Sequence, residues 1–280
     1  MTNAPRSYGT AEWVKEKGIT GNAGDTAGSG TSIFDPVLCE LAYRWFSPPD
    51  GIVLDPFAGG SVRGIVAAKL RREYVGCELR PEQVKANVDQ ANKICDQGVM
   101  PVWHVGDSAV TIPRLDIAAD FVFTCPPYGD LEVYSDRTDD LSAMEHGEFV
   151  KAYNVIIGAA VAKLKPDRFA CCVVGDFRDK KGFYRNFVSD TILAFESAGA
   201  KLYNEAILVT AVGSLPVRVG KQFSASRKLG KTHQNVLVFC KGDPKRATLA
   251  CGQCEFGELD AIPGAQGGDT GVDATLGVTS

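Results

Sequence analysis

Residues 51–61 read Gly-Ile-Val-Leu-Asp-Pro-Phe-Ala-Gly-Gly-Ser, an apolar run that ends in a glycine-rich turn. The run 51–55 has the length and the branched side chains of a buried strand, and a helix-like segment begins near Arg63. Glycines between a strand and a helix let the backbone approach a ligand closely, and ligands of open α/β sheets bind at the carboxyl ends of strands. The stretch therefore predicts a ligand-binding loop. It lacks the Gly-Lys-Ser/Thr ending of a P-loop, so triphosphate binding is not supported.

Short apolar runs alternate with amphipathic stretches along the rest of the chain. Strand-like runs lie at 51–55, 73–78, 102–105, 121–124, 169–174, 206–210 and 235–239, and helix-like stretches at 36–45, 63–71, 81–97, 149–164 and 182–198. Alternation of this kind predicts an α/β fold with a seven-stranded, mostly parallel, doubly wound sheet. Residues 211–234 show no clear helix, so a hairpin and an antiparallel last strand are expected there.

The composition predicts one elaborated domain with two tails. With 280 residues, 45% of them hydrophobic, the chain is long enough to bury one sizeable core. Residues 1–30 and 251–280 lack periodicity and are interpreted as a flexible N-terminal segment and an acidic, glycine-rich tail, leaving 31–250 as the domain. Long apolar runs, a signal sequence and regular cysteine spacing are absent from the sequence, so we expect a cytoplasmic protein with reduced thiols.

Two acidic residues follow the second and third predicted strands. A carboxylate at Glu78 can accept both hydroxyls of a ribose, although an acid at the end of a strand can equally be solvated. Asp107 can accept from an adenine amine, or it can cap the helix that follows. Together with the loop at 55–61, these acids predict a nucleoside-containing cofactor at this edge of the sheet.

The fourth predicted strand leads into Thr124-Cys-Pro-Pro-Tyr-Gly129. Consecutive prolines have no N–H groups and are stiff and extended, so their carbonyls face outward at a fixed angle. Such carbonyls can accept from an exocyclic amine and leave its lone pair free to attack a methyl group, while Tyr128 stacks on the base. The alternative is a rigid turn with a packed tyrosine.

Asp55-Pro-Phe-Ala-Gly-Gly and Cys125-Pro-Pro-Tyr together resemble the S-adenosylmethionine-dependent DNA amino-methyltransferases, over roughly residues 31–245. The resemblance implies a class I methyltransferase fold, which is Rossmann-like, and direct methyl transfer to adenine N6 or cytosine N4 of a flipped base. Residues 31–36 resemble the segment that encloses the methionine part of the cofactor. The implied cofactor residues are Phe34, Asp55, Pro56, Phe57, Gly59, Glu78 and Asp107, and the implied catalytic residues are Cys125, Pro126, Pro127 and Tyr128.

Residues 174–178 and 231–243 are similar to methylases carried by tailed bacteriophages. This similarity implies a role in the cytoplasm of a bacterium, including a phage-infected host, in which methylation protects DNA in the setting of restriction and modification.

The sequence departs from the family pattern at two positions. Ser61 stands where the family's loop usually ends in glycine, and Cys125 stands where its catalytic tetrapeptide begins with Asp, Asn or Ser. A cysteine is a weak hydrogen-bond partner, and its size leans toward the cytosine-N4 subgroup. It also opens a rival chemistry, attack on cytosine C6 as in carbon-5 methyltransferases. An RNA or protein-amide methyltransferase, and a degenerate homologue that binds without turnover, remain as alternatives.

The segment 211–234 contains five basic residues and no acid, in a chain with a net charge of −4. These candidates for phosphate contacts with double-stranded DNA are Arg218, Lys221, Arg227, Lys228 and Lys231. The alternative is a solvated, exposed hairpin. The acidic segment 129–147 is expected to form a lid. Residues 251–254 form one Cys-x-x-Cys pair, which supplies two metal ligands, so no metal is expected.

Overall fold

The computed structural model describes residues 34–95, 98–128, 140–209 and 215–254, with the backbone alone at 215–218. Seven strands form one sheet: β1 (Ile52–Asp55), β2 (Glu73–Glu78), β3 (Val102–Val105), β4 (Ala119–Thr124), β5 (Leu164–Val174), β6 (Lys201–Val209) and β7 (His233–Lys241). The helices are α2 (Pro36–Phe46), α3 (Val62–Lys69), α4 (Pro81–Ile94), α5 (Ser108–Arg114), α6 (His146–Lys163), α7 (Phe187–Ser197), α8 (Leu215–Ser226) and α9 (Pro244–Cys251), with a 3-10 turn, η2 (Leu141–Ala143).

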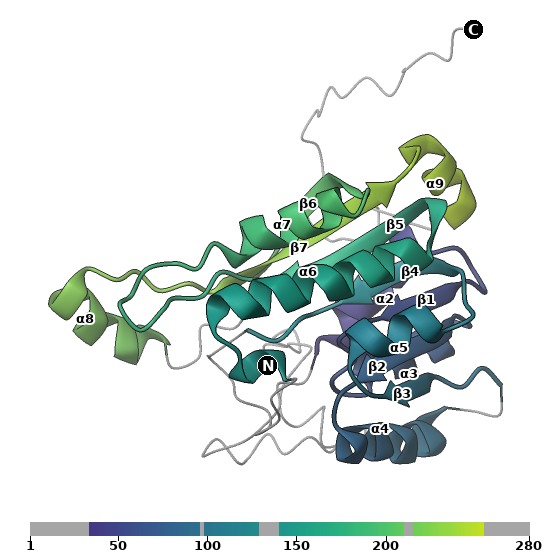
Figure 1. Cartoon of the computed structure of the whole chain (residues 1–280), viewed down its shortest axis with the longest axis horizontal. Coiled ribbons are helices and arrows are strands. Elements are labelled where there is room, and N and C mark those ends of the chain that lie inside the picture. Colours follow the sequence, from purple (N-terminus) through teal and green to yellow (C-terminus); the bar gives the residue numbers. More distant parts are fainter. Residues whose placement is uncertain (1–33, 96–97, 129–139, 210–214, 255–280) are drawn as a thin grey trace, which may run out of the picture.

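The strands follow the order β3-β2-β1-β4-β5-β7-β6 (Figure 1). The neighbours from β3 to β5 pair in parallel, whereas β7 runs antiparallel to both β5 and β6. The expected mostly parallel sheet with an antiparallel last strand is therefore confirmed. The last strand lies inside the sheet, between β5 and β6, and β6 forms the edge.

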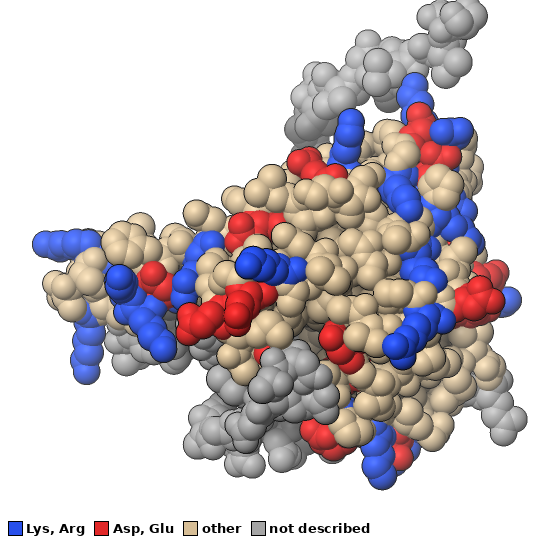
Figure 2. Space-filling model, viewed as in Figure 1, with Lys and Arg blue, Asp and Glu red and all other residues tan. Residues whose placement is uncertain are grey.

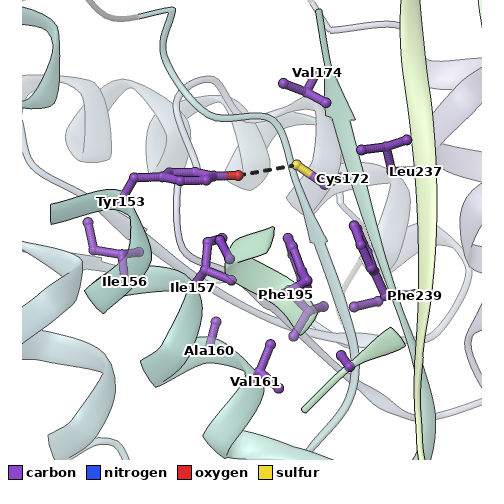
Figure 3. Close-up of a cluster of buried hydrophobic side chains, with 14 of the residues drawn as sticks. Tyr153, Ile156, Ile157, Ala160, Val161, Cys172, Val174, Phe195, Leu237 and Phe239 are labelled. Carbon is purple, nitrogen blue, oxygen red and sulfur yellow. Dashed lines mark hydrogen bonds between the residues drawn. The ribbon is translucent and has the colours of Figure 1, made fainter. Parts of the chain in front are cut away.

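Helices cover both faces of the sheet, and successive strand residues alternate between two cores. Val53 packs with α2, α3, α4 and α9, and its neighbour Leu54 packs with α5, α6 and α7. Figure 3 shows the second core, where Tyr153 of α6 lies 3.8 Å from the sulfur of Cys172. In the same core, the rings of Phe195 and Phe239 stack with centroids 4.1 Å apart. This arrangement confirms the doubly wound sheet.

Three helices differ from the sequence-based expectation. Helix α5 was not predicted because it has seven residues and contains Pro113. Helix α8 occupies the segment expected to be a plain hairpin; β6 and β7 do pair antiparallel, but they are joined through this helix. Helix α9 begins after the cap Asp243, whose side chain accepts from the N–H of Arg246, and it ends at Cys251. Ordered structure therefore continues past the expected boundary at 250.

Within the part of the chain that the structure describes, the helices are all too short or too polar to cross a membrane.

Candidate functional site

A cavity of about 940 Å³ opens at the carboxyl ends of the parallel strands. Loops that follow β1 to β5 form its walls, together with the end of β6 and the start of β7. Both predicted sets of residues contribute to its lining, namely Phe34, Pro56, Phe57, Gly59, Glu78, Asp107, Cys125, Pro126, Pro127 and Tyr128. The fold therefore brings the glycine-rich loop and the Cys-Pro-Pro-Tyr segment to one site.

Asp55 differs from the other predicted cofactor residues because it lies beneath the loop, fully buried, and is not part of the cavity wall. One carboxylate oxygen accepts from the Phe57 N–H at 3.1 Å and from the Thr124 hydroxyl at 2.7 Å. The other accepts from Arg63 Nε at 2.6 Å and from the Tyr74 hydroxyl at 2.7 Å. Because Thr124 immediately precedes Cys125, this single carboxylate links the glycine-rich loop to the strand end that leads into the Cys-Pro-Pro-Tyr segment. Asp55 therefore contacts the residues around the loop from below, and its expected contact with the cofactor stays a prediction.

Arg63 is the buried partner of Asp55, and the sequence did not reveal its role. Its guanidinium donates to the carbonyls of Phe57 at 2.6 Å and Ala58 at 3.1 Å, and it lies 4.6 Å from the ring centre of Phe34. Burial lowers the pKa of the Arg63 guanidinium, but the nearby Asp55 carboxylate more than offsets this, so the pKa is raised. A charged arginine therefore holds the loop from below.

The conformation and surroundings of the loop require two glycines, one in the loop and one in strand β2. Gly59 has φ of +50°, a left-handed conformation that side chains other than glycine rarely adopt. A Cβ at Gly76 would lie 2.9 Å from that of Ala58, whose N–H donates to the Cys77 carbonyl at 2.9 Å. Strand β2 therefore approaches the loop closely. Ser61, the departure from the family pattern, is buried and donates to Gln90 of α4.

The two acids after β2 and β3 line the cavity, as expected. Oε1 of Glu78 accepts from the N–H of Arg80 at 3.0 Å and lies 3.3 Å from its Nε. Burial raises the pKa of Glu78, and the contacts with Arg80 only partly oppose this. Asp107 caps α5 by accepting from the N–H of Ala109 at 2.8 Å, so the capping interpretation is correct and coexists with its place in the wall.

The Cys-Pro-Pro-Tyr segment continues the wall from β4. Pro126 is buried, while Cys125, Pro127 and Tyr128 are half-buried. The ring of Tyr128 packs edge-on against Phe177 at 6.1 Å, and its hydroxyl accepts from the side-chain amide of Gln234. Tyr128 is therefore both a packed side chain and part of the cavity.

The basic candidates occupy different positions. Lys231 lines the cavity beside His233 and Gln234. Lys221 is exposed on α8, and the side chain of Arg218 lies outside the described residues. Arg227 and Lys228 follow α8 and lie away from the cavity, in a separate groove. One of the five candidates is therefore a wall residue.

The remaining features of the site are the expected lid, Asp176 and the potential metal ligands. The expected lid falls largely on 129–139, outside the described residues, although Asp140 and Leu141 line the cavity. Asp176 lines it too, and accepts from the N–H of Val188 at the start of α7. Within the described ranges, His, Cys, Asp and Glu side chains form no group of three able to hold a metal ion.

The glycine-rich loop lies in a segment that matches a known protein family. Residues 36–89 match a family model described as DNA methylase. The matched segment contains 51–61 and Glu78, so the resemblance expected from the sequence is confirmed there. It stops before the Cys-Pro-Pro-Tyr segment.

The similar curated proteins are bacterial type II methyltransferases. The chain is 38% identical over 64 residues to M.XycI of Xanthomonas campestris pv. cyanopsidis, covering 23% of this chain and 21% of that protein. It is 40% identical over 60 residues to M1.MboII of Moraxella bovis, covering 21% and 22%. The chain thus matches about a fifth of the length of these relatives.

Among solved structures, TrmN from Thermus thermophilus is similar at 16% identity. The match covers 74% of this chain and 49% of that one, with a TM-score of 0.49.

Proposed function

We propose that this protein transfers a methyl group from S-adenosylmethionine to the exocyclic amine of a DNA base, cytosine N4 or adenine N6. One observation carries the proposal. A glycine-rich loop within the DNA methylase match and a Cys-Pro-Pro-Tyr segment line the same cavity, and the buried carboxylate of Asp55 accepts from Phe57 of the loop and from Thr124, the residue before Cys125.

The wall residues fit this cofactor. Phe34 and Phe57 give an apolar surface, and Gly59 lets the backbone come close to a ligand. Glu78 and Asp107 line the same cavity, and in this proposal they accept from the ribose hydroxyls and from the adenine amine, respectively. When bound, S-adenosylmethionine supplies an electrophilic methyl group on a sulfonium.

The tetrapeptide provides for the base. The carbonyls of this stiff segment accept hydrogen bonds from the N–H groups of the target amine. This orients the lone pair of the amine toward the cofactor side of the cavity. Tyr128 is held by Phe177 and Gln234, and its ring forms a stacking surface for the flipped base. Cys125 begins the segment in place of the stronger hydrogen-bonding residues of the family.

The setting that we propose is the cytoplasm of a bacterium, including a phage-infected host, with double-stranded DNA as the partner. The bacterial type II methyltransferases among the relatives support the DNA substrate. The phage setting is supported by the resemblance of 174–178 and 231–243 alone.

The test is expression in a methylation-free bacterium, followed by mass spectrometry of nucleosides from its DNA. We expect N4-methylcytosine or N6-methyladenine. Tyr128→Ala should lower the methylation rate by about one to two orders of magnitude, because base–aromatic stacking contributes about 1–3 kcal/mol. Tyr128→Phe keeps the ring and should retain most of the rate.

The other outcomes are also informative. A 5-methylcytosine peak would assign Cys125 as a nucleophile and overturn amine methylation. A folded protein that binds S-adenosylmethionine but leaves DNA unmodified would point to RNA or a protein amide as the substrate. DNA binding without methylation by the wild-type chain would support a binding role without turnover.

A further inference from the structure

A second concave site, of about 390 Å³, lies between the hairpin 178–184 and the end of α8 with the turn after it. Among the described residues that line it are four cations and no carboxylate. These cations are Arg178 and Lys181 from the hairpin, and Arg227 and Lys228 from the turn. We call this site the basic groove. Figure 2 shows Lys and Arg side chains gathered at the α8 end of the molecule.

The hairpin side of the groove is held by its own backbone. Arg178 and Tyr184 form an antiparallel bridge, and the N–H of Asp179 donates to the Phe183 carbonyl at 2.8 Å. The Asp179 carboxylate accepts from the N–H of Phe183 at 2.9 Å, a bond that lowers the pKa of this acid. The single acid of the hairpin is therefore engaged with the hairpin backbone, and the cations face the groove.

Close contact joins the two sides. A Cβ at Gly182 would lie 2.6 Å from Cε of Lys228, so a larger residue at this position would displace the lysine. Arg227 has φ of +56° directly after α8, and its guanidinium lies 5.0 Å from the ring centre of Phe223. Lys228 therefore lies against the hairpin, while Arg227 lies over Phe223 of α8 and lines the same groove.

Aromatic side chains accompany the cations. The guanidinium of Arg178 lies 3.9 Å from the ring centre of Tyr184, and Phe183 is 71% exposed. Cations beside exposed aromatic rings are the usual means of binding a nucleic-acid strand, because phosphates and bases or sugars are contacted together. An acidic protein partner would be bound through the cations and would not account for the exposed ring of Phe183.

The basic groove adjoins the cavity along two chain segments. Phe177 lines the cavity, and the next residue, Arg178, lines the groove. On the other side, Lys231 lines the cavity and Lys228 lines the groove. Three residues of extended chain span at most about 11 Å, which is about the axial rise of three nucleotides along a DNA strand.

We infer that the basic groove holds the sugar–phosphate backbone of the DNA strand beside the target nucleotide. The four cations contact phosphates, and Phe183 packs against a sugar or base. The choice of DNA rests on the proposed function, whereas the groove itself rests on the geometry above. Such contacts do not depend on base sequence.

The test measures binding of a fluorescein-labelled 24-base-pair duplex to the full chain across a salt series. Lys181→Gln and Lys228→Gln should each weaken binding about tenfold at 0.1 M salt, and each should reduce the slope of log affinity against log salt by about 0.9. Duplexes of unrelated sequence should lose affinity equally. Phe183→Ser should weaken binding and leave the salt slope unchanged.

Lys245→Gln is the matched control, since it removes the same charge from exposed α9, far from α8 (Figure 1). Binding and slope should not change. Melting temperatures near the wild-type value show that the groove variants are folded.

The outcomes separate the two proposals. If Lys181→Gln and Lys228→Gln bind with wild-type affinity and slope, the groove inference is overturned, even if the wild-type chain methylates DNA. If the variants lose binding but the wild-type chain leaves DNA bases unmodified, the groove stands and the proposed function fails. A wild-type chain that neither binds nor methylates DNA overturns both.

Discussion

The described chain has two halves, residues 34–128 and residues 140–254, and each half contributes to the cavity wall in a different way. In the first half, the loops rest on a buried network in which Asp55 and Arg63 are at most 5% exposed. In the second half, every residue of β6 except Leu208 is exposed, and helix α8 extends beyond the sheet (Figure 1). The match to DNA methylases lies wholly in the first half. The proposed cofactor contacts thus lie on the half with the buried network, and the proposed DNA contacts lie on the exposed half.

The largest expected effect comes from removing the charge that holds the first half together. Asp55→Asn keeps the shape of the side chain but leaves the Arg63 guanidinium buried without its counter-charge. Loss of one partner of a buried ion pair typically costs about 3–5 kcal/mol, so urea unfolding should show a free energy of unfolding lower by that amount. Cofactor binding should fall as well.

Asp89→Asn provides the comparison, because Asp89 pairs with Lys85 on the exposed face of α4. This variant should unfold at the wild-type urea concentration. Equal stability of Asp55→Asn and wild type would show that the first half does not depend on its buried network.

A smaller effect is expected at Glu78, within the same half. Glu78→Gln should weaken binding of S-adenosylmethionine by about 1.5–3 kcal/mol, roughly 10- to 150-fold, because hydrogen bonds to a charged acceptor are lost. Isothermal titration calorimetry measures this. Glu82→Gln, at an exposed position in the next helix, should bind as the wild type does.

The same residue predicts a pH dependence. Burial raises the pKa of Glu78 above 4.5, and the ionised form is the one that accepts the ribose hydroxyls. Affinity should therefore be full above this raised pKa and fall as the pH drops through it, at a higher pH than for an ordinary glutamate. An equally steep fall in Glu78→Gln would exclude Glu78 as its source.

The smallest effect on stability should come from the second half. Phe223 on α8 is 39% exposed and supports Arg227. Phe223→Ser should change the free energy of unfolding by no more than about 0.5 kcal/mol. The affinity for duplex DNA should nevertheless fall about two- to tenfold, because Arg227 loses the ring beside its guanidinium, and ordering a freed side chain on binding costs about 0.5–1.5 kcal/mol.

The exposed apolar Leu249 on α9 offers the control, and Leu249→Ser should alter neither quantity. If Phe223→Ser unfolds as readily as Asp55→Asn, the proposed contrast between the halves is wrong.

The sheet could be predicted because its strands are apolar runs of strand length. Their alternation with helices indicates that most of the strands run parallel. Helix α8 could not be predicted, because its sequence contains Gly220 and the β-branched Val217 and Val219, residues of lower helix propensity. The proposed roles of Glu78 and residues 125–128 were accessible because parallel strands end at one edge of a sheet. That edge is where the cavity lies.

The roles of Asp55 and Arg63 were not accessible in this way. An acid at the end of the first strand has the appearance of a ligand residue, and its partners Tyr74 and Thr124 come from two other strands. Arg227 and Lys228 were expected to contact phosphates, but their meeting with Arg178 and Lys181 escaped prediction for a similar reason, since the hairpin 178–184 and the turn 226–228 are distant in sequence. Contacts between remote segments are set by the tertiary fold and are not visible in local patterns.

The position of β7 also has a consequence for biosynthesis. Because β7 lies between β5 and β6, strand β6 has no sheet neighbour until residues 233–241 have emerged from the ribosome. Until then, the nascent chain presents an unpaired β5 edge and a free β6 with exposed Ile207 and Val209, a combination prone to aggregation. Completion of the sheet therefore waits for almost the whole described chain, and chaperone capture during translation should be strongest over this interval.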